Sequence, residues 1–106
     1  DGSQKTLVID TKALPVLPDV EEYASMGLIP GGAYRNREFA DKSGYQSSAQ
    51  LWREDLVFDP QTSGGLLAAV PAEEAEKLLA ELKELDLPCA VIGEVTDRKD
   101  YALLIR

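Results

Sequence analysis

The polar segment at residues 59–65 contains the side chains best suited to binding chemistry. Asp59, Thr62 and Ser63 supply a carboxylate and two hydroxyls, and Gly64 and Gly65 follow directly. Hydroxyls and exposed backbone amides can hydrogen-bond an anion, while glycines allow a positive φ or the close approach of a ligand or another backbone. The same residues can also form a simple turn before a strand, in which the side chains cap local groups. Residue chemistry alone leaves the anion site and the turn as equal alternatives.

A second group of candidate residues lies upstream, at Arg35 and Asn36. A guanidinium and an amide presented from a loop could face an anionic ligand at a domain interface. Alternatively, these residues stabilise the loop through hydrogen bonds, or through an ion pair among the charged side chains nearby. Those charged side chains are Arg35, Arg37, Glu38 and Asp41. We favour the functional interpretation for Asn36 and assign no function to Arg37.

The composition excludes several classes of mechanism and partner. The chain has no histidine and a single cysteine, Cys89, so it contains no Ser-His or Cys-His nucleophile, no intramolecular disulfide and no thiolate metal cluster. We expect Cys89 to be a buried strand residue and not a reactive thiol. With 11 Lys and Arg against 19 Asp and Glu, the net charge of −8 disfavours nucleic acids and anionic membrane surfaces. No apolar run reaches the roughly 20 residues that span a bilayer, and the amino end does not resemble a signal sequence, so we expect a cytoplasmic protein.

The first half of the chain predicts a strand, a short helix and a long loop. Residues 5–10 are rich in β-branched and aliphatic side chains, which favours a strand. Residues 19–27 begin with Asp19 in a capping-box pattern and end at a glycine suited to the left-handed position after a helix. Glycines and a proline interrupt residues 29–48, and no regular periodicity persists there, so we expect an extended ordered loop. Residues 49–58 should then form one or two helical turns.

The second half predicts a β-α-β-β unit. The apolar run at residues 66–70 is typical of a strand covered on both faces. Residues 71–85 carry an apolar stripe at helical spacing, and we expect burial of that stripe to stabilise a helix. The stripe consists of Ala75, Leu78, Leu79, Leu82 and Leu85. A strand at residues 89–95 should run parallel to the strand at residues 66–70, to which the helix connects it by a right-handed crossover. A last strand at residues 101–105 should pair with the strand at residues 89–95 in antiparallel fashion.

These elements indicate a single α+β domain over residues 1–106. The sheet should be mixed, because the helical crossover joins parallel strands and the short final turn joins antiparallel ones. The carboxyl-terminal β-α-β-β unit should be ferredoxin-like in part.

Three segments of the chain resemble motifs of the selenophosphate synthetase family, also called selenide, water dikinase. Along the chain they are residues 27–36 (GLIPGGAYRN), 59–67 (DPQTSGGLL) and 92–95 (IGEV), which is the order found in that family. The family is related to aminoimidazole ribonucleotide synthetase, and its members combine an amino-terminal ATP-binding domain with a carboxyl-terminal α/β domain. The resemblance implies that this chain is an incomplete version of the second domain. It also implies a magnesium-dependent enzyme that makes selenophosphate from selenide, ATP and water and that works as a homodimer.

The resemblance assigns no catalytic residue and no metal ligand to this chain. In the family, the reactive cysteine or selenocysteine, its lysine and the aspartates that hold Mg2+ and ATP belong mainly to the amino-terminal domain, and a further motif should precede residue 1. We therefore expect the chain alone to bind neither Mg2+ nor ATP and to be inactive. Its implied partners are the ATP-binding domain of the same enzyme, a second copy in a homodimer, and the small molecules selenide and ATP.

The candidate residues are expected to lie near phosphate or the selenium substrate, in a cleft between the two domains. They are Asn36, Asp59, Thr62, Ser63, Gly64 and Gly65. An alternative from another class is a small acidic ligand-binding or regulatory module without catalysis. A third is an interaction domain whose unpaired strand edges recruit a partner or a second copy.

Overall fold

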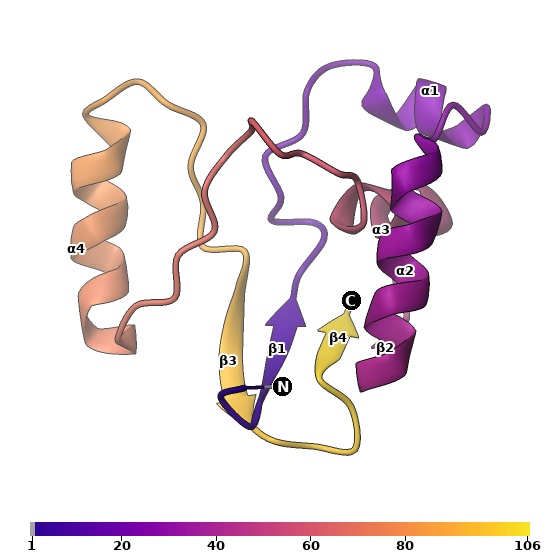
Figure 1. Ribbon diagram of the computed structural model, residues 1–106. Helices are drawn as coiled ribbons and strands as arrows, with labels where there is room; N and C mark the ends of the chain where they lie inside the picture. The colour runs from indigo at the N-terminus through magenta and orange to yellow at the C-terminus, as the bar shows by residue number, and fades with distance from the viewer. Residues whose placement is uncertain (1) are drawn as a thin grey trace.

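The computed structural model describes residues 2–106 as a mixed four-stranded sheet with helices around it (Figure 1). The strands are β1 (Lys5–Ile9), β2 (Tyr45–Ser47), β3 (Gly93–Asp97) and β4 (Leu103–Ile105). The helices are α1 (Val20–Ser25), α2 (Gly31–Ser43), α3 (Leu51–Val57) and α4 (Ala72–Lys83). The predicted α+β class with a mixed sheet is confirmed.

The sheet is built around β1. The strand order is β2-β4-β1-β3, with β1 parallel to β4 and antiparallel to β3, and β4 parallel to β2. Leu7 therefore lies opposite Leu103 on one side and Val95 on the other. Val8 is only 2% exposed, as expected for an apolar strand in an interior position of the sheet. The three parallel strands all end at the same edge of the sheet.

The prediction that the last two strands pair with each other is wrong, because β1 lies between β3 and β4. The connection between them crosses the start of β1, where the fully buried Thr6 holds it. The Oγ1 of Thr6 donates to the backbone oxygen of Tyr101 at 2.6 Å and accepts from the backbone nitrogen of Lys99 at 3.0 Å. A buried hydroxyl that is satisfied in both directions stabilises this crossing. Strand and turn propensities alone do not encode such a long-range contact.

The extended loop expected at residues 29–48 is also wrong, because α2 and β2 occupy most of it. The helix begins at Gly31 and ends before Gly44, which has a φ of 77°. The side chains that α2 buries are small: Ala33 is 1% exposed, and Ala40 packs against the same core. Because alanines replace the usual stripe of large apolar residues, the helical period is hidden in the sequence.

Helices α1 and α3 confirm two predicted helices. After α1, Gly27 has a φ of 81°, and its backbone nitrogen donates to Ala24 at 2.9 Å. The next nitrogen, that of Leu28, donates to the oxygen of Tyr23 at 3.1 Å, which completes a Schellman motif. The expected capping box is not formed, because Asp19 adopts a left-handed conformation (φ 65°) and its side chain makes no capping hydrogen bond. A capping side chain reaches the first amides from an extended backbone instead.

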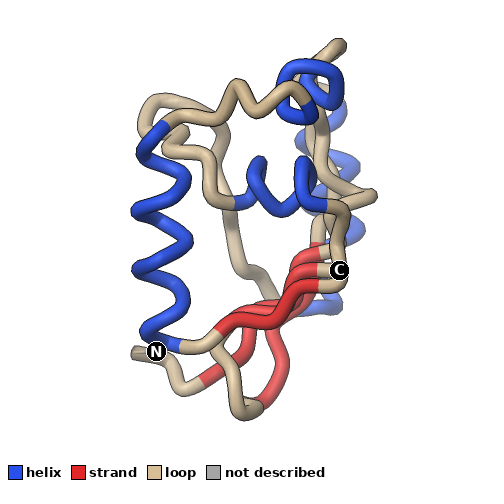
Figure 2. Tube along the Cα trace, turned by 90° about the vertical axis from the view of Figure 1, so that its right-hand side faces the viewer, coloured by secondary structure: helices blue, strands red, loops and turns tan. Residues whose placement is uncertain are grey.

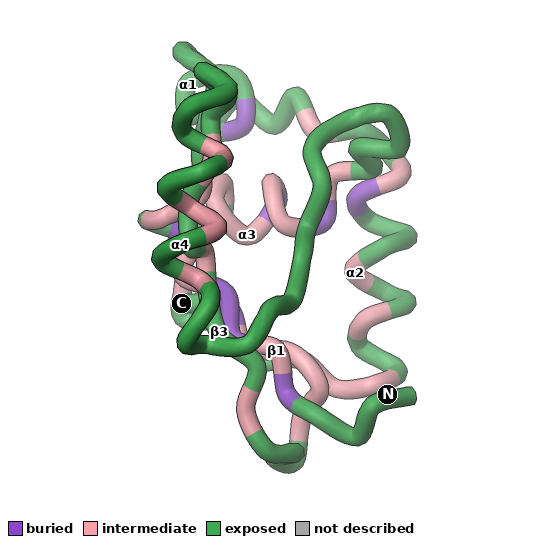
Figure 3. The backbone as a smooth tube through the Cα atoms, turned by 90° about the vertical axis from the view of Figure 1, so that its left-hand side faces the viewer, coloured by how far each residue is buried: buried purple, intermediate pink, exposed green. Residues whose placement is uncertain are grey.

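The predicted strand at residues 66–70 is wrong, and so is the parallel crossover built on it. These residues have no regular secondary structure, and Leu66 is 100% exposed. Figure 3 draws the segment that leads into α4 as continuously exposed. A strand needs a neighbouring strand for its backbone hydrogen bonds, and none of the four strands within residues 2–106 pairs with this segment. Apolar composition without a partner does not produce a strand.

The helix predicted at residues 71–85 is confirmed as α4, but its apolar stripe is not buried. Most of the stripe is half-buried, and Leu85 is 62% exposed. Figure 1 shows α4 apart from α2 and α3, on the β3 side of the molecule. The many Ala, Glu, Lys and Leu residues of α4 are strong helix formers, so intrinsic propensity supports this helix more than packing does. Within residues 2–106, no helix combines the length and apolar character needed to cross a bilayer.

The strand expected at residues 89–95 starts later, at Gly93, because its partner β1 ends at the paired residue Ile9. An added Cβ at Gly93 would clash with the backbone oxygen of Val8, so the two backbones are in direct contact here. Cys89 is half-buried and lies in the irregular segment before β3. The expectation that Cys89 is a buried strand residue is therefore wrong.

The hydrophobic core lies between the sheet and the helices α2 and α3. Its buried residues are Ala33 of α2, Phe58 after α3 and Ile105 of β4, and partly buried side chains such as Tyr45 and Leu103 surround them. Figure 2 shows α2 and the shorter α3 on the same side of the strands. Because this core is small, polar contacts between α2 and α3 contribute to how these helices are held.

Candidate functional site

Arg37 joins α2 to α3 next to the candidate loop. Its Nη2 lies 2.5 Å from Oδ1 of Asp55, and its Nε lies 3.1 Å from Oε1 of Glu54. The guanidinium also lies over the ring of Phe58, 5.2 Å from its centroid, and Tyr45 packs edge-on against the same ring at 5.3 Å. We call Arg37, Tyr45, Glu54, Asp55 and Phe58 the Arg37 cluster. It fixes Phe58, the residue immediately before Asp59.

The electrostatics of the Arg37 cluster favour its ion pairs. Burial of the Arg37 guanidinium acts to lower its pKa, but the hydrogen bond and charge of Asp55 and the charge of Glu54 outweigh burial and raise the pKa. Burial raises the pKa of the Tyr45 phenol, and the charge and hydrogen bond of Glu54 raise it further. The phenol donates to Oε1 of Glu54 at 3.2 Å. Arg37 therefore stays charged and Tyr45 stays neutral at ordinary pH.

The structure brings the two glycine-containing segments of the sequence together. Nδ2 of Asn36 donates to the backbone oxygen of Phe58 at 2.9 Å. One turn earlier in α2, Gly32 lies so close to Pro60 that an added Cβ would come within 2.8 Å of the proline Cγ. The start of α2 and residues 58–60 are thus in direct contact. Asn36 is accordingly a residue that holds the candidate loop in place.

Residues 59–65 form an exposed turn. The backbone nitrogens of Gln61 and Thr62 donate to the oxygens of Asp59 and Pro60 at 2.9 and 3.0 Å. Asp59 is half-buried, whereas Thr62 and Ser63 are exposed. Within residues 2–106, the side chains of Asp59, Thr62 and Ser63 make no hydrogen bond. The capping role considered for these side chains is not seen, so their polar atoms are available to a ligand or another domain.

The paired glycines at residues 31–32 and 64–65 do not have a positive φ. Among the glycines of residues 2–106, a positive φ occurs at Gly27 and Gly44. Gly64 lies close to Gln61, since an added Cβ would be 3.2 Å from the Cβ of Gln61. An added Cβ at Gly65 would meet nothing within 4 Å. Gly64 therefore has a steric role inside the turn, while Gly65 leaves the backbone open to approach from outside.

The loop offers hydroxyls, amides and one carboxylate, which suit contact with an anionic ligand. Across residues 2–106, no three acidic or thiol side chains converge as metal ligands would. Asp59 alone does not make a magnesium site, so no chemical step through a metal is assigned to this chain.

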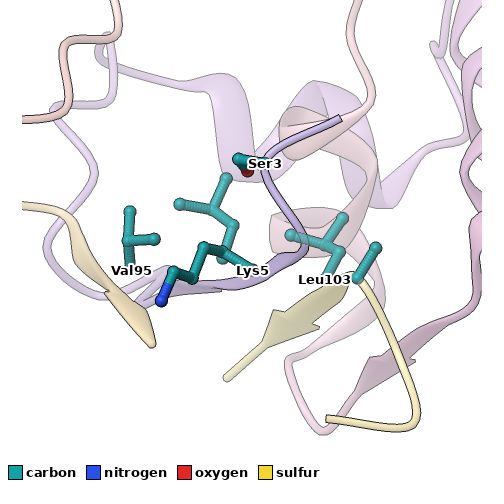
Figure 4. A pocket seen from close by; sticks show the side chains of 6 residues that line it. Ser3, Lys5, Val95 and Leu103 are labelled. Atoms are coloured by element: carbon teal, nitrogen blue, oxygen red, sulfur yellow. The ribbon is translucent and has the colours of Figure 1, made fainter. Parts of the chain in front are cut away.

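A cavity of about 370 Å3 lies elsewhere, over the starts of β1 and β4 (Figure 4). Leu7, Val95 and Leu103 give it an aliphatic lining, and its one cationic group is the amine of Lys5. That amine is hydrogen-bonded to Oδ1 of Asp97 at 2.8 Å, and this bond and the charge of Lys5 lower the pKa of Asp97. The cavity presents little chemistry and is separate from the candidate loop.

The chain matches the family described as AIR synthase related protein, C-terminal domain, over residues 1–106, and it belongs to that family. Its helices and four-stranded mixed sheet agree with a part of such a domain.

Among individual relatives, the chain is 52% identical over 86 residues to a selenide, water dikinase of Pelobacter propionicus, which covers 79% of this chain and 25% of that protein. Selenide, water dikinases of Treponema denticola and Pseudomonas putida are each 40% identical, over 109 and 104 residues. These matches cover 98% and 97% of this chain but 31% and 29% of the relatives. The chain thus spans between a quarter and a third of the length of these relatives.

The sequence predicts the loop residues as candidates but does not indicate the structural role of Arg37. The ion-pair partners predicted for Arg37 lie in its own segment, whereas the actual partners Glu54 and Asp55 lie 17 and 18 residues further along the chain. An adjacent acidic pair on the next predicted helix was the available signal. The contact between Gly32 and Pro60 had no sequence signal beyond the glycine itself.

Replacing Arg37 with alanine should lower the free energy of unfolding by about 3 kcal/mol, because it leaves the buried Asp55 carboxylate unpaired. Urea denaturation measures this loss. The matched control is Lys5→Ala, whose ion pair with Asp97 is exposed and screened by solvent, so its stability should hardly change. Equal losses in the two variants would contradict the role of the Arg37 cluster.

Replacing Gly32 with alanine should destabilise the protein by about 1–3 kcal/mol, because the new methyl group overlaps the rigid ring of Pro60. Gly31→Ala is the matched control, since an added Cβ there meets only the end of a flexible arginine side chain at 3.9 Å. It should stabilise the helix by about 0.5 kcal/mol. Thermal unfolding of both variants tests this, and a Gly32→Ala protein as stable as Gly31→Ala would show that the two segments do not touch.

Proposed function

We propose that this chain is the carboxyl-terminal portion of a selenide, water dikinase, an enzyme that makes selenophosphate from selenide, ATP and water. The observation that carries the proposal is the direct contact between the start of α2 and residues 58–60, through Gly32 with Pro60 and Asn36 with Phe58. These are parts of the two longest segments in which the chain resembles that family. The names of the relatives described above support the same assignment.

In this proposal, residues 59–65 face the amino-terminal ATP-binding domain and help to enclose phosphate or the selenium substrate. Thr62 and Ser63 donate hydrogen bonds from their exposed hydroxyls, and the open backbone at Gly65 allows close approach. Asn36 is a positioning residue, because its amide already holds the oxygen of Phe58. Asp59 contributes a carboxylate without a partner in residues 2–106.

The proposal places Mg2+ and ATP on the amino-terminal domain. When bound there, ATP would supply the phosphoryl group and Mg2+ would offset its negative charge, while this chain would hold the loop at residues 59–65 in position. The proposal further includes a homodimer and a cytoplasmic location. The chain has no histidine and a single cysteine, so it lacks the common Ser-His and Cys-His catalytic pairs. This composition agrees with a role in positioning and not in the chemical step.

In the full-length protein that contains this chain, Thr62→Ala or Ser63→Ala should lower kcat/KM for selenophosphate formation by about tenfold to a hundredfold. The reason is the loss of one hydrogen bond to a charged group. Phosphorus NMR of the product gives the rate, and thermal unfolding checks the fold. Ser25→Ala, an exposed serine on α1, is the matched control and should leave the kinetics unchanged. Unchanged kinetics in both loop variants, with unchanged folding, would contradict a role of these hydroxyls in binding and would show that the loop is only structural.

The 106-residue chain alone should form no selenophosphate, since the proposal assigns the reacting groups and both cofactors to the amino-terminal domain. The measurement is the same phosphorus NMR assay with selenide, ATP and Mg2+, and the full-length protein serves as the positive control. Selenophosphate formation by the purified chain would refute this division of labour.

A further inference from the structure

A second cavity, of about 550 Å3, lies where the three parallel strands β1, β4 and β2 end. The residues that follow each strand form its rim, and α3 contributes Arg53. The rim includes Asp10, Thr11, Lys12, Ser48, Arg53 and Arg106. In open α/β sheets, ligands bind outside the carboxyl ends of the parallel strands, and this cavity lies at the corresponding edge of the present mixed sheet. None of these residues belongs to the candidate loop at residues 59–65.

The rim is held by hydrogen bonds between the strand ends. Thr11 is 1% exposed, and both its backbone nitrogen and its Oγ1 donate to the backbone oxygen of Arg106, at 2.7 and 2.9 Å. The backbone nitrogen of Ser48 donates to Ile105 at 2.9 Å. The backbone segments that follow the three strands are therefore fixed relative to one another before any ligand arrives.

The charge of the rim is opposite to that of the whole chain. The rim contains three cationic side chains and one acidic side chain, and the α-carboxylate of Arg106 adds a second negative charge in the 106-residue chain, so the rim is still net positive while the chain carries a net charge of −8. Arg53 is positioned by a hydrogen bond from Nη1 to the backbone oxygen of Thr11 at 2.8 Å and by its stacking 4.3 Å from the centroid of Trp52. Neither Arg53 nor Lys12 has a carboxylate partner within residues 2–106. In so acidic a chain, two unpaired cations beside one cavity are notable.

The one acidic side chain of the rim is occupied locally. Oδ1 of Asp10 accepts a hydrogen bond from the backbone nitrogen of Lys12 at 3.1 Å, which turns the carboxylate toward its own loop. The third cation is Arg106, whose Nη2 lies 3.9 Å from Oε1 of Glu94 in an exposed pair that solvent screens.

We propose that this rim binds a small molecule through a phosphate or carboxylate group. Arg53 presents a fixed planar guanidinium, which suits two hydrogen bonds to such an oxyanion, and Lys12 adds a mobile positive charge. The hydroxyl of Ser48 lies on the same rim and can donate a further hydrogen bond. The proposal uses other residues than the dikinase assignment and does not depend on it.

The test is a titration of the 106-residue chain with inorganic phosphate and, separately, with citrate at low ionic strength, followed by amide NMR. We expect saturable shifts at Thr11, Lys12 and Ser48, together with a change in the fluorescence of Trp52, the single tryptophan. Saturation by phosphate alone identifies a phosphate site, and saturation by citrate alone identifies a carboxylate site. Shifts that stay linear and small with both anions would overturn the proposal.

Three variants sharpen the test. Lys12→Gln changes an exposed side chain without a partner, so the protein should fold, and it should weaken binding about fivefold to tenfold. Asp10→Asn keeps the oxygen that accepts from Lys12 but removes the negative charge, so it should strengthen binding about threefold. Lys99→Gln, at the opposite edge of the sheet, is the matched control and should leave binding unchanged. Equal weakening by Lys12→Gln and Lys99→Gln would show nonspecific attraction and overturn the site.

Discussion

The ion pair between Arg37 and Asp55 joins α2 to α3, and the candidate segments lie at the start of α2 and directly after α3. The hydrophobic core between the sheet and these helices contains three buried apolar residues, so it fixes their relative position only weakly. A buried carboxylate needs its partner, because an unpaired charge in that position is strongly unfavourable. The pair therefore favours the arrangement of α2 and α3 in which Arg37 faces Asp55. The ring of Phe58 packs against both Arg37 and Tyr45, and these contacts fix the position at which the next residue, Asp59, begins the loop.

Because of this ion pair, the candidate site has two parts: residues 58–60, which contact α2, and residues 62–63, whose side chains make no hydrogen bond in the described part of the chain. On the held side, Asn36 fixes the oxygen of Phe58, and Gly32 leaves room for Pro60. On the free side, the side chains of Thr62 and Ser63 are exposed and make no hydrogen bond in the described part of the chain. A rigid base that presents unsatisfied polar groups is suited to binding a ligand or a second domain. The structure thus separates the residues that position the loop from those available for contact.

Elements whose signal is local could be predicted from the sequence. The Schellman motif at Gly27 and the helix-forming composition of α4 are examples, as is the apolar strand β1. Elements that depend on distant partners could not. The apolar side chains that α2 packs against the core are alanines, so its sequence lacks the usual period of large apolar residues. Residues 66–70 have the apolar composition of a strand but no neighbouring strand to pair with among the four strands of residues 2–106.

In the candidate site, too, residues with a local signal could be predicted from the sequence, and residues that act through distant contacts could not. Its polar loop residues were visible as a cluster of turn-forming and hydroxyl residues beside two glycines. The residues that hold the loop were not, because Arg37 pairs with α3 and Gly32 contacts Pro60 across the fold. The crossing of β1 by the connection before β4 likewise depends on one buried hydroxyl, that of Thr6.

The contact between the two segments can be observed directly. A nuclear Overhauser spectrum of the 106-residue chain should show cross-peaks between the α-protons of Gly32 and the ring protons of Pro60, since these groups are in van der Waals contact. Cross-peaks from the side-chain amide of Asn36 to Phe58 or Asp59 should accompany them. A well-folded spectrum that lacks both sets of cross-peaks would contradict the account, because the two segments would then lie apart.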